Sequence, residues 1–424
     1  SARLGFAGSI SFNANVMCSM PRSLVAFLPL LFYPLVVCAI PLCPVWSDPY
    51  ISRIPTDKLM SQLSREDVAC YSHLPMDGLT VTERVDPTVW AHSESFPSCK
   101  ENTDSGHMLS KKQLEYFETH GFVYMPGLFE PELVEKWMDL INAATSQLNP
   151  DVPEGRSGSG QESNVTLNGR QVTVNFILEP QGPDSKTATV KTIKAVHETL
   201  LADEKLNFHR NPKVARKVEQ ILGSSVYVVQ SRLNLQQPFS GVGFNWHSDF
   251  ETWHNEDGMP KPRCVSAIVA LEEMTEFNGP WMAIPGSHKY FVHTFQDKLH
   301  SGDNYKTSLS AQYLGSPARN QLSWLFERAK EHLGQGIHVG KMEKGGVVLF
   351  DCNLMHGSPN NISPLGRKTV FMVFNSVDNI HMDKPFANQR TELRPQHLAG
   401  RGAVEPIKCP SSQAARDMPS QQEL

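Results

Sequence analysis

Cysteine is scarce in this sequence, with 8 residues among 424. The cysteines are scattered, and none of them forms a CxxC pair or another spacing typical of a zinc site. Such a set is too sparse for a disulfide scaffold, which excludes the small disulfide-rich class of secreted domain. Cys264 and Cys352 lie in apolar, strand-like stretches, so we predict that both are reduced thiols in the core.

An excess of positive charge is also missing. Lys and Arg number 39 against 44 Asp and Glu, which gives a formal net charge of −5. A protein that holds nucleic acid mainly through phosphate contacts needs a basic surface, so we expect no nucleic-acid partner. The hydrophobic content of 40% supplies enough material for a large core and excludes wholesale disorder.

Long apolar runs are limited to one stretch near the start of the chain, from Leu24 to Trp46. It is long enough to cross a bilayer, although four prolines interrupt it. Arg22 precedes it, and a basic residue before an apolar run is typical of a targeting signal. We therefore interpret residues 1–46 as a targeting-like segment, which predicts secretory or organellar localisation. If the segment does not act as a signal, the prediction is a cytoplasmic protein. If retained, this segment would be the chain's contact with membranes.

Residues 47–108 are polar and rich in Pro and Ser, which predicts an arm or linker before the main domain. Helix signals follow. Ser110 with Gln113 forms a capping box, and Gly121 supplies a helix end. Further helices are predicted where apolar residues recur at helical spacing or where a cap and a proline begin the segment: one carrying Leu133, Trp137, Leu140 and Ile141, and one from Asn211 and Pro212 to Gly223. Residues 148–190 are predicted to be loops around a strand at 171–178.

Strand signals dominate from residue 225 onward. Residues 225–235 alternate in character, with Gln230, Arg232 and Asn234 on one face. Other predicted strands are short apolar stretches separated by turn residues: 122–125, 243–249, 264–271, 281–284, 346–351 and 368–376. Helices followed by many short strands predict helices packed on one side of a β-sandwich or barrel. The tail at 389–424 is rich in Pro, Gln and Ser and is predicted to be disordered.

The tripeptide His247-Ser248-Asp249 carries the candidate chemistry. On a strand, residues two apart share a face, so Asn245, His247 and Asp249 are expected to point together, with Phe244 on the other face. His356 follows the strand-like run GVVLFDCNLMH and is a candidate third ligand. Two histidines and one carboxylate form the facial triad of non-haem Fe(II) oxygenases, which leaves coordination positions open.

Arg367 strengthens this interpretation. It lies eleven residues after His356, at the start of a predicted apolar strand, where a buried guanidinium would bind a carboxylate through its two-pronged edge. An HxD tripeptide alone occurs often by chance, whereas its combination with a later histidine and this arginine indicates a functional site. His254 and His288 are expected to be structural hydrogen-bonding residues rather than ligands.

The stretch FNWHSDFETWHNEDGMP, from Phe244 to Pro260, resembles the ectoine hydroxylases, a branch of the phytanoyl-CoA dioxygenase superfamily. The similarity extends over roughly residues 76–388 and is weakest at 145–200. Other segments carry it as well: RVDPTVW at 84–90, QSRLN at 230–234, NGPWMAIPGSH at 278–288 and FDCNLMHGSPNNISP at 350–364.

The resemblance implies a mainly β fold with flanking helices, an α+β arrangement built around a double-stranded β-helix (a cupin-like jelly-roll), over residues 109–388. It also implies Fe(II), with 2-oxoglutarate and O₂ as cosubstrates. His247, Asp249 and His356 match the metal ligands, Arg367 matches the residue that binds the distal carboxylate of 2-oxoglutarate, and Phe244 lies beside that cosubstrate. Residues that match the ectoine-binding positions are Arg232, Gln230, Trp253 and Phe371. The implied reaction converts ectoine to 5-hydroxyectoine with release of succinate and CO₂.

Two departures from the resemblance bear on substrate preference. Trp281 stands where a smaller aliphatic residue is more common, and Gln236 replaces a polar residue near the cosubstrate. The alternatives left open are the same chemistry on another small substrate such as proline or on an acyl-CoA, a catalytically silent solute-binding jelly-roll, and a zinc hydrolase, for which no general base is apparent. A homodimer is also left open.

Overall fold

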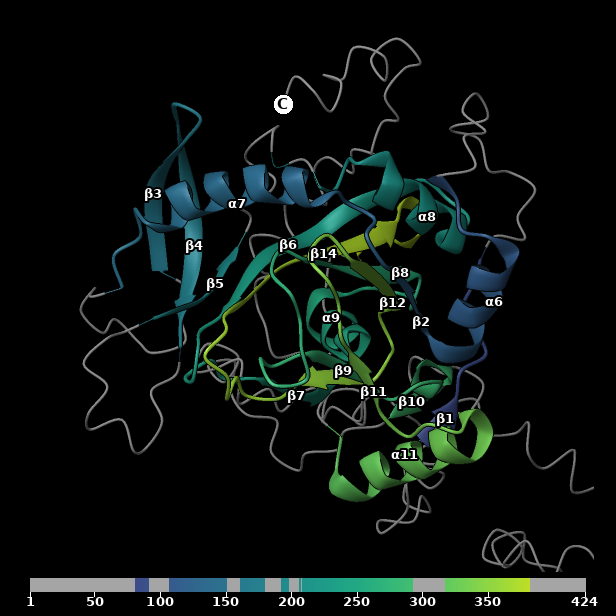
Figure 1. Cartoon of the computed structure of the whole chain (residues 1–424). Coiled ribbons are helices and arrows are strands. Elements are labelled where there is room, and N and C mark those ends of the chain that lie inside the picture. Colours follow the sequence, from purple (N-terminus) through teal and green to yellow (C-terminus); the bar gives the residue numbers. More distant parts are fainter. Residues whose placement is uncertain are drawn as a thin grey trace, which may run out of the picture. The chain divides into compact units, whose positions relative to one another are not determined.

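The computed structural model of the chain describes residues 81–90, 107–150, 161–179, 192–197, 206, 208–292 and 317–381 (Figure 1). All of them lie in one compact unit, which begins at Thr80. The targeting-like segment 1–46, the part of the predicted arm before residue 81 and the tail at 389–424 lie outside the described residues. Among the helices of the described ranges, none has the length and apolar character needed to cross a membrane.

A large and a small antiparallel sheet form the core of the fold, as expected for a mainly β protein with flanking helices, and a separate two-stranded sheet lies beside them. The large sheet has the strand order β2-β12-β8-β14-β6-β5-β4-β3. Its strands are β2 (Phe122–Met125), β3 (Gln161–Leu167), β4 (Arg170–Leu178), β5 (Ile193–His197), β6 (Val226–Gln236), β8 (Cys264–Ala270), β12 (Val347–Asp351) and β14 (Arg367–Ser376). The small sheet has the order β11-β9-β13-β7. Its strands are β7 (Phe244–His247), β9 (Trp281–Ala283), β11 (His338–Gly340) and β13 (His356–Ser358).

The predicted helices form where their caps indicated. Helix α6 (Lys111–His120) begins after the Ser110–Gln113 capping box and ends at Gly121, which adopts the left-handed conformation. Helix α8 (Pro212–Leu222) begins after the Asn211 cap and ends at Gly223 in the same way. Helix α7 (Pro131–Thr145) carries the expected apolar face.

Helices α7 and α8 cover one face of the large sheet, and the small sheet lies on the other side (Figure 1). The main core joins apolar side chains of these helices to one face of the large sheet, among them Val134, Trp137, Ile141, Val214, Val218, Leu233, Val269, Leu349 and Val370. Because strand side chains alternate, the neighbours of these core residues point to the small sheet. This alternation places Arg232 and Asn234 of β6 on the inner face, as predicted.

Several elements escaped prediction because their sequences are not strongly periodic or apolar. Strand β3 lies in the segment expected to be a loop, so that expectation is wrong there. It is an edge strand in which Val165 and Leu167 are buried and the intervening residues are exposed. Strand β5, the short strand β13, helix α9 (Asp249–Asp257) and helix α11 (Arg319–Leu333) were not predicted either.

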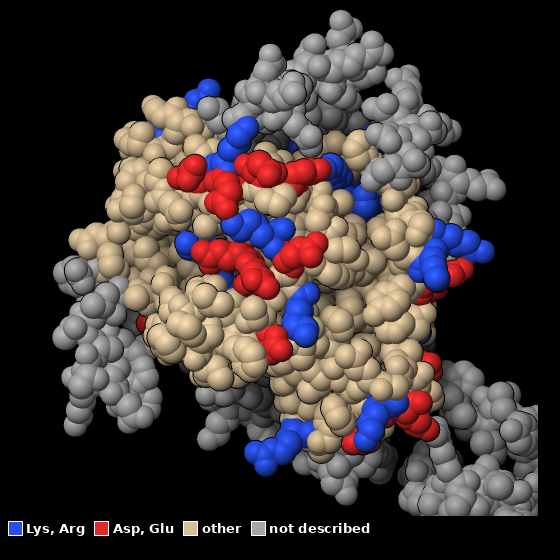
Figure 2. Space-filling model, in the orientation of Figure 1, with Lys and Arg blue, Asp and Glu red and all other residues tan. Residues whose placement is uncertain are grey.

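On the face shown in Figure 2, Lys and Arg side chains lie beside Asp and Glu side chains rather than in a patch of one sign. An exposed example of such pairing is Lys111 with Glu115, which lie one helical turn apart at 3.7 Å. Pairs of this kind contribute little to stability because water screens them.

Residues 81–90, which the composition assigns to the arm, are part of the folded unit. Strand β1 (Val81–Glu83) pairs with β10 (Tyr290–Val292). The next residue, Arg84, is buried and forms an ion pair at 2.9 Å with Asp351 at the end of β12. Asp351 also accepts a hydrogen bond from the backbone N–H of Asn353 at 2.8 Å. Arg84 therefore holds the start of the loop that leads to His356.

Replacing Arg84 with Met should lower the free energy of unfolding by about 3–5 kcal/mol, because the change leaves the buried Asp351 carboxylate without its counter-charge. Urea unfolding monitored by circular dichroism measures this loss. The matched control is Lys111→Met, which removes the exposed partner of Glu115 and should change stability by no more than about 0.5 kcal/mol. Equal, small effects of the two substitutions would contradict a stabilising role for the buried pair.

Candidate active site

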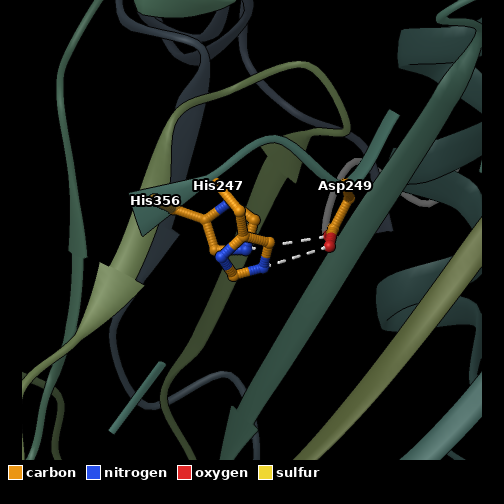
Figure 3. A group of neighbouring side chains, drawn as sticks. All are labelled: His247, Asp249 and His356. Atoms are coloured by element: carbon orange, nitrogen blue, oxygen red, sulfur yellow. Dashed lines mark ion pairs between the residues drawn. The ribbon is translucent and has the colours of Figure 1, made fainter. Parts of the chain in front are cut away.

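His247 and His356 meet across the small sheet. His247 ends β7, His356 begins β13, and the two residues are paired in the antiparallel register. Their ring centroids lie 4.3 Å apart. Both imidazoles point towards the carboxylate of Asp249 (Figure 3). The structure thus brings together the three residues that the sequence predicted as metal ligands.

The element that holds Asp249 is a helix and not the predicted strand. The strand expected over 243–249 ends at His247, and Asp249 is the first residue of α9. The prediction that Asn245, His247 and Asp249 share a strand face is therefore wrong, and Asn245 is exposed. A carboxylate in the first turn of a helix is favoured by the helix dipole, which helps the chain to leave the sheet at this point.

A bulge in the pairing of β7 with β13 changes the direction of the Phe244 side chain from the one expected. The register of β7 against β13 shifts between the His247–His356 pair and the Phe244–Ser358 pair. Such a bulge re-aims a side chain relative to strict alternation. The Phe244 ring, expected to face away from His247, lies beside the guanidinium of Arg232, with 5.4 Å between the ring centroid and Cζ.

The hydrogen bonds of the two imidazoles leave only acceptors facing the centre of the site. Nδ1 of His247 lies 2.6 Å from the carbonyl oxygen of Asn245, and Nδ1 of His356 lies 2.9 Å from that of Leu354. A carbonyl can only accept, so each Nδ1 carries the proton and each Nε2 offers a lone pair. These Nε2 atoms lie 3.5 Å and 3.7 Å from the two carboxylate oxygens of Asp249.

The charges of the three groups suit a cation. Burial and the neighbouring His247 together lower the pKa of His356 to about 4. Burial raises the pKa of Asp249, but His356, His247 and Arg232 outweigh this and bring it below its usual value. Near neutral pH the site therefore holds an ionised carboxylate and a neutral His356 imidazole. Ser266 of β8 donates a hydrogen bond to the carboxylate at 3.2 Å.

This arrangement is suited to a metal ion. The three ligand atoms lie within 4.8 Å of one another, and no other group of three His, Cys, Asp or Glu side chains in the described ranges meets this condition. Ligand atoms bind such an ion at about 2.0–2.2 Å, so the spacing needs only a small contraction around it. Two imidazoles and one carboxylate are typical of non-haem Fe(II) sites with open positions.

Arg367 lies at the start of β14 opposite Gln236 of β6. It is buried, and its Nε and Nη2 donate to Oε1 of Gln236 at 2.9 Å and 2.7 Å. Burial lowers the pKa of the guanidinium to about 10, so it remains charged near neutral pH. Gln236 in turn packs on Gly279, where an added Cβ would lie 2.0 Å from Oε1. The glycine is required there by this close approach and by its φ of +78°.

The predicted substrate residues lie on the elements that surround the three ligands. Arg232 lies over the Phe371 ring as well as that of Phe244, with Cζ 5.0 Å from the Phe371 centroid. Gln230 is buried two residues before Arg232, on the same strand, β6. Trp253 is buried on α9, the helix that Asp249 begins. Among the predicted residues, Arg232 therefore contacts the rings of both Phe244 and Phe371.

Comparison with known proteins identifies the family. Residues 117–369 match the model of the family described as phytanoyl-CoA dioxygenase (PhyH). The chain belongs to the phytanoyl-CoA dioxygenase family. The resemblance seen in the sequence is thereby confirmed, and the two facing antiparallel sheets are its double-stranded β-helix core.

Within the phytanoyl-CoA dioxygenase family, the chain is similar to ectoine dioxygenases. It is 37% identical to the Halomonas elongata protein over 292 residues, which cover 69% of this chain and 76% of that one. It is 34% identical to the Streptomyces coelicolor protein over 337 residues, which cover 79% and 96% of the two chains.

Solved structures give the same result. EctD from S. alaskensis with 2-oxoglutarate and 5-hydroxyectoine has a TM-score of 0.57 and 28% identity, covering 79% of this chain and 95% of that one. EctD from the same source with bound Fe has a TM-score of 0.56 and 29% identity, with coverages of 78% and 94%.

Trp281, which departs from the residue more common in the family, is separated from His356 by a single aromatic ring, that of Phe350. It is buried on β9, its ring centroid is 5.2 Å from that of Phe350, and Phe350 lies 4.8 Å from the His356 ring. An indole here adds bulk behind the wall of the site. The predictions for His254 and His288 are confirmed, because each is buried and bonded to a backbone carbonyl, of Met259 and Glu118 respectively.

Two charged residues near Phe244 were missed in the sequence. Lys194 is buried on β5, with Nζ 4.5 Å from the Phe244 ring centroid. Glu179 follows β4 and accepts a hydrogen bond from the backbone N–H of Val242 at 3.3 Å. Lys194 lies in the short strand β5 and Glu179 directly follows the predicted strand 171–178, but no local signal in the sequence connects either residue with Phe244.

Removing one ligand should abolish tight metal binding. We expect His247→Ala to weaken Fe(II) binding by more than about a hundredfold, since even residues that only support a ligand contribute up to that factor. Anaerobic equilibrium dialysis with metal analysis measures this. His332→Ala, which removes an exposed histidine beside Glu331, should leave the bound metal unchanged. Undiminished binding by His247→Ala would exclude this cluster as the metal centre.

Proposed function

We propose that this protein is an Fe(II)- and 2-oxoglutarate-dependent dioxygenase that hydroxylates ectoine to 5-hydroxyectoine, with release of succinate and CO₂. The observation that carries the proposal is the convergence of His247, Asp249 and His356 beside the half-buried guanidinium of Arg232, on the same sheet face as the buried Arg367. The similarity to ectoine dioxygenases, and to EctD structures with Fe and with 2-oxoglutarate and 5-hydroxyectoine, supports it.

The donor set agrees with ferrous iron as the resident metal. Two Nε2 lone pairs and an ionised carboxylate facing one another would be unfavourable in a buried site without a cation between them. When bound by His247, Asp249 and His356, ferrous iron supplies the activation of O₂ and the oxidative chemistry. The chain's own residues hold these ligands in place through the bonds of the two imidazoles to backbone carbonyls and of Ser266 to Asp249.

Arg367 is assigned to the cosubstrate. 2-Oxoglutarate carries two carboxylates, one of which, with the keto group, would bind the metal, while the other would need a counter-charge. A buried guanidinium is well suited to the second, because it remains charged and donates several hydrogen bonds in fixed directions. Gln236 fixes the orientation of Arg367 from one edge, and Phe244 provides an apolar wall nearby.

Arg232 and the aromatic rings are assigned to ectoine, a small cyclic amidinium carboxylate. The Arg232 guanidinium can bind the carboxylate, and the faces of aromatic side chains such as Phe371 and Trp253 can bind the delocalised cation. Gln230 adds a polar group on the same strand. Burial of Gln230, Trp253 and Phe371 excludes water from the reacting atoms, which protects the site from unproductive oxidation. A homodimer and targeting through residues 1–46 remain predictions.

A substrate panel tests the reaction. With Fe(II), ascorbate and 2-oxoglutarate, the purified chain should convert ectoine to 5-hydroxyectoine with one succinate formed for each product, as measured by mass spectrometry and succinate assay. Proline and an acyl-CoA are the comparison substrates. If succinate release responded to proline and not to ectoine, the chemistry would stand but the substrate assignment would be wrong.

The roles of the two arginines should separate in kinetics. Arg367→Ala should raise the KM for 2-oxoglutarate by about tenfold or more, because it removes a charged hydrogen-bonding partner of the carboxylate. Arg232→Ala should raise the KM for ectoine by a similar factor. Steady-state measurements with each reactant varied in turn distinguish the two. If both variants affected only ectoine, Arg367 would not be the cosubstrate residue.

A further inference from the structure

Lys194 occupies an unusual position for a lysine. It lies in the middle of β5, between the buried or half-buried residues Ile193 and Ala195, and is 3% exposed. The register of β4 against β5 shifts here, since Ile177 pairs with Ala195 and Leu178 with Ile193. Lys194 is thus the extra residue of a bulge, a feature that commonly redirects a side chain. Its ammonium contacts the Phe244 ring and the carbonyl oxygen of Gly243, the last residue of the loop before β7.

The contacts of the Lys194 ammonium leave part of its donor capacity unused. An ammonium has three N–H donors. In the part of the chain that the structure describes, its hydrogen-bond acceptor is the carbonyl oxygen of Gly243 at 3.4 Å, and its other close contact is the Phe244 ring at 4.5 Å. Burying a cation with so few partners is costly. The position therefore indicates a ligand that carries acceptors.

Glu179 lies at the same place with the opposite charge. Its Oε2 accepts from the Val242 N–H at 3.3 Å, while its Oε1 is buried without a hydrogen-bond partner in the described part of the chain. Glu179 and Lys194 thus bind adjacent residues, Val242 and Gly243, immediately before Phe244. Burial raises the pKa of Glu179 to about 7, and the charges of Lys194 and Arg367 oppose this rise.

The charges around Phe244 do not balance within this group. Lys194 interacts electrostatically with Arg232 and Arg367, Glu179 is the carboxylate that offsets Lys194 and Arg367, and Asp249 is the carboxylate near Arg232. Lys194 and Arg367 are buried and share Glu179 as their carboxylate, so together they favour an anionic ligand. Because Gln236 occupies the Nε and Nη2 edge of Arg367, that arginine offers a carboxylate only part of its hydrogen-bonding capacity, and a second cation would complete the site.

We propose that Lys194 is a further positioning residue for the cosubstrate. Its ammonium binds the distal carboxylate of 2-oxoglutarate together with Arg367, and Glu179 weakens this binding by offsetting part of the positive charge. The inference rests on the proposed function. It goes further because it assigns opposite effects on the affinity for 2-oxoglutarate to Lys194 and Glu179.

Anaerobic calorimetric titration of 2-oxoglutarate into the Fe(II)-loaded protein near neutral pH tests the proposal without turnover. Lys194→Met keeps the length of the side chain and removes its charge, and it should weaken binding on the order of tenfold to a hundredfold. Lys194→Arg should restore most of this loss. Glu179→Gln keeps an acceptor for the Val242 N–H and removes the charge, and it should strengthen binding roughly threefold.

The matched control is Lys368→Met. Lys368 follows Arg367 on β14 and is paired with Glu272 at 3.1 Å, so its loss should leave the dissociation constant within about twofold. Circular dichroism and the melting temperature establish that each variant is folded. If Lys194→Met is not folded, the sign of the Glu179→Gln effect decides, and unchanged or weakened binding overturns the proposal.

Failure of the proposed function and failure of this inference give different results. A wild-type protein that does not bind 2-oxoglutarate overturns both. Normal binding in the wild type with unchanged binding in Lys194→Met overturns the inference alone. A rise in the KM for ectoine without a change in 2-oxoglutarate binding also overturns it, because Lys194 would then act with Arg232 on the substrate. Weaker 2-oxoglutarate binding in Lys194→Met with stronger binding in Glu179→Gln supports it.

Discussion

The convergence of three acceptors in a buried site is the constraint on which the rest of the structure depends. His247 and His356 each bind a backbone carbonyl through Nδ1, so their Nε2 lone pairs face the Asp249 carboxylate. The antiparallel pairing of β7 with β13 sets the distance between the imidazoles. Arg84 holds the loop before His356 through Asp351. A cation between the acceptors would turn an unfavourable cluster into a stable centre.

The large sheet supplies the charges that this centre needs beside it. One face of the sheet is buried under α7 and α8 by apolar residues, and alternation leaves the other face free for polar groups directed at the ligands. Ser266 of β8, Arg232 of β6 and Arg367 of β14 come from three strands of this inner face. The burial of Ser266 and Arg367 keeps water away and strengthens the charge interactions there. The apolar core and the polar site are therefore two faces of one sheet.

Much of this fold was predictable because its signals are local. The capping box at Ser110 and the Asn211 cap with its proline identified two helices almost to the residue. Alternation in β6 correctly separated the face of Arg232 from that of Leu233. The strand over 243–249 failed at its end, because strict alternation cannot anticipate a bulge or a helix that begins at Asp249. Edge strand β3 was missed because, among its described side chains, only Val165 and Leu167 are buried.

The sequence by itself determined the candidate metal ligands and the candidate cosubstrate arginine, since the HxD tripeptide, the later His356 and Arg367 are recognisable from residue types and spacing. It also determined the helices whose caps are local. Only the tertiary structure decided which charged side chains lie near Phe244. No local pattern connects Lys194 or Glu179 with Phe244, and only strand pairing between separate segments places them beside it. Electrostatic interactions depend on distance in space and on burial, which residue order does not encode locally.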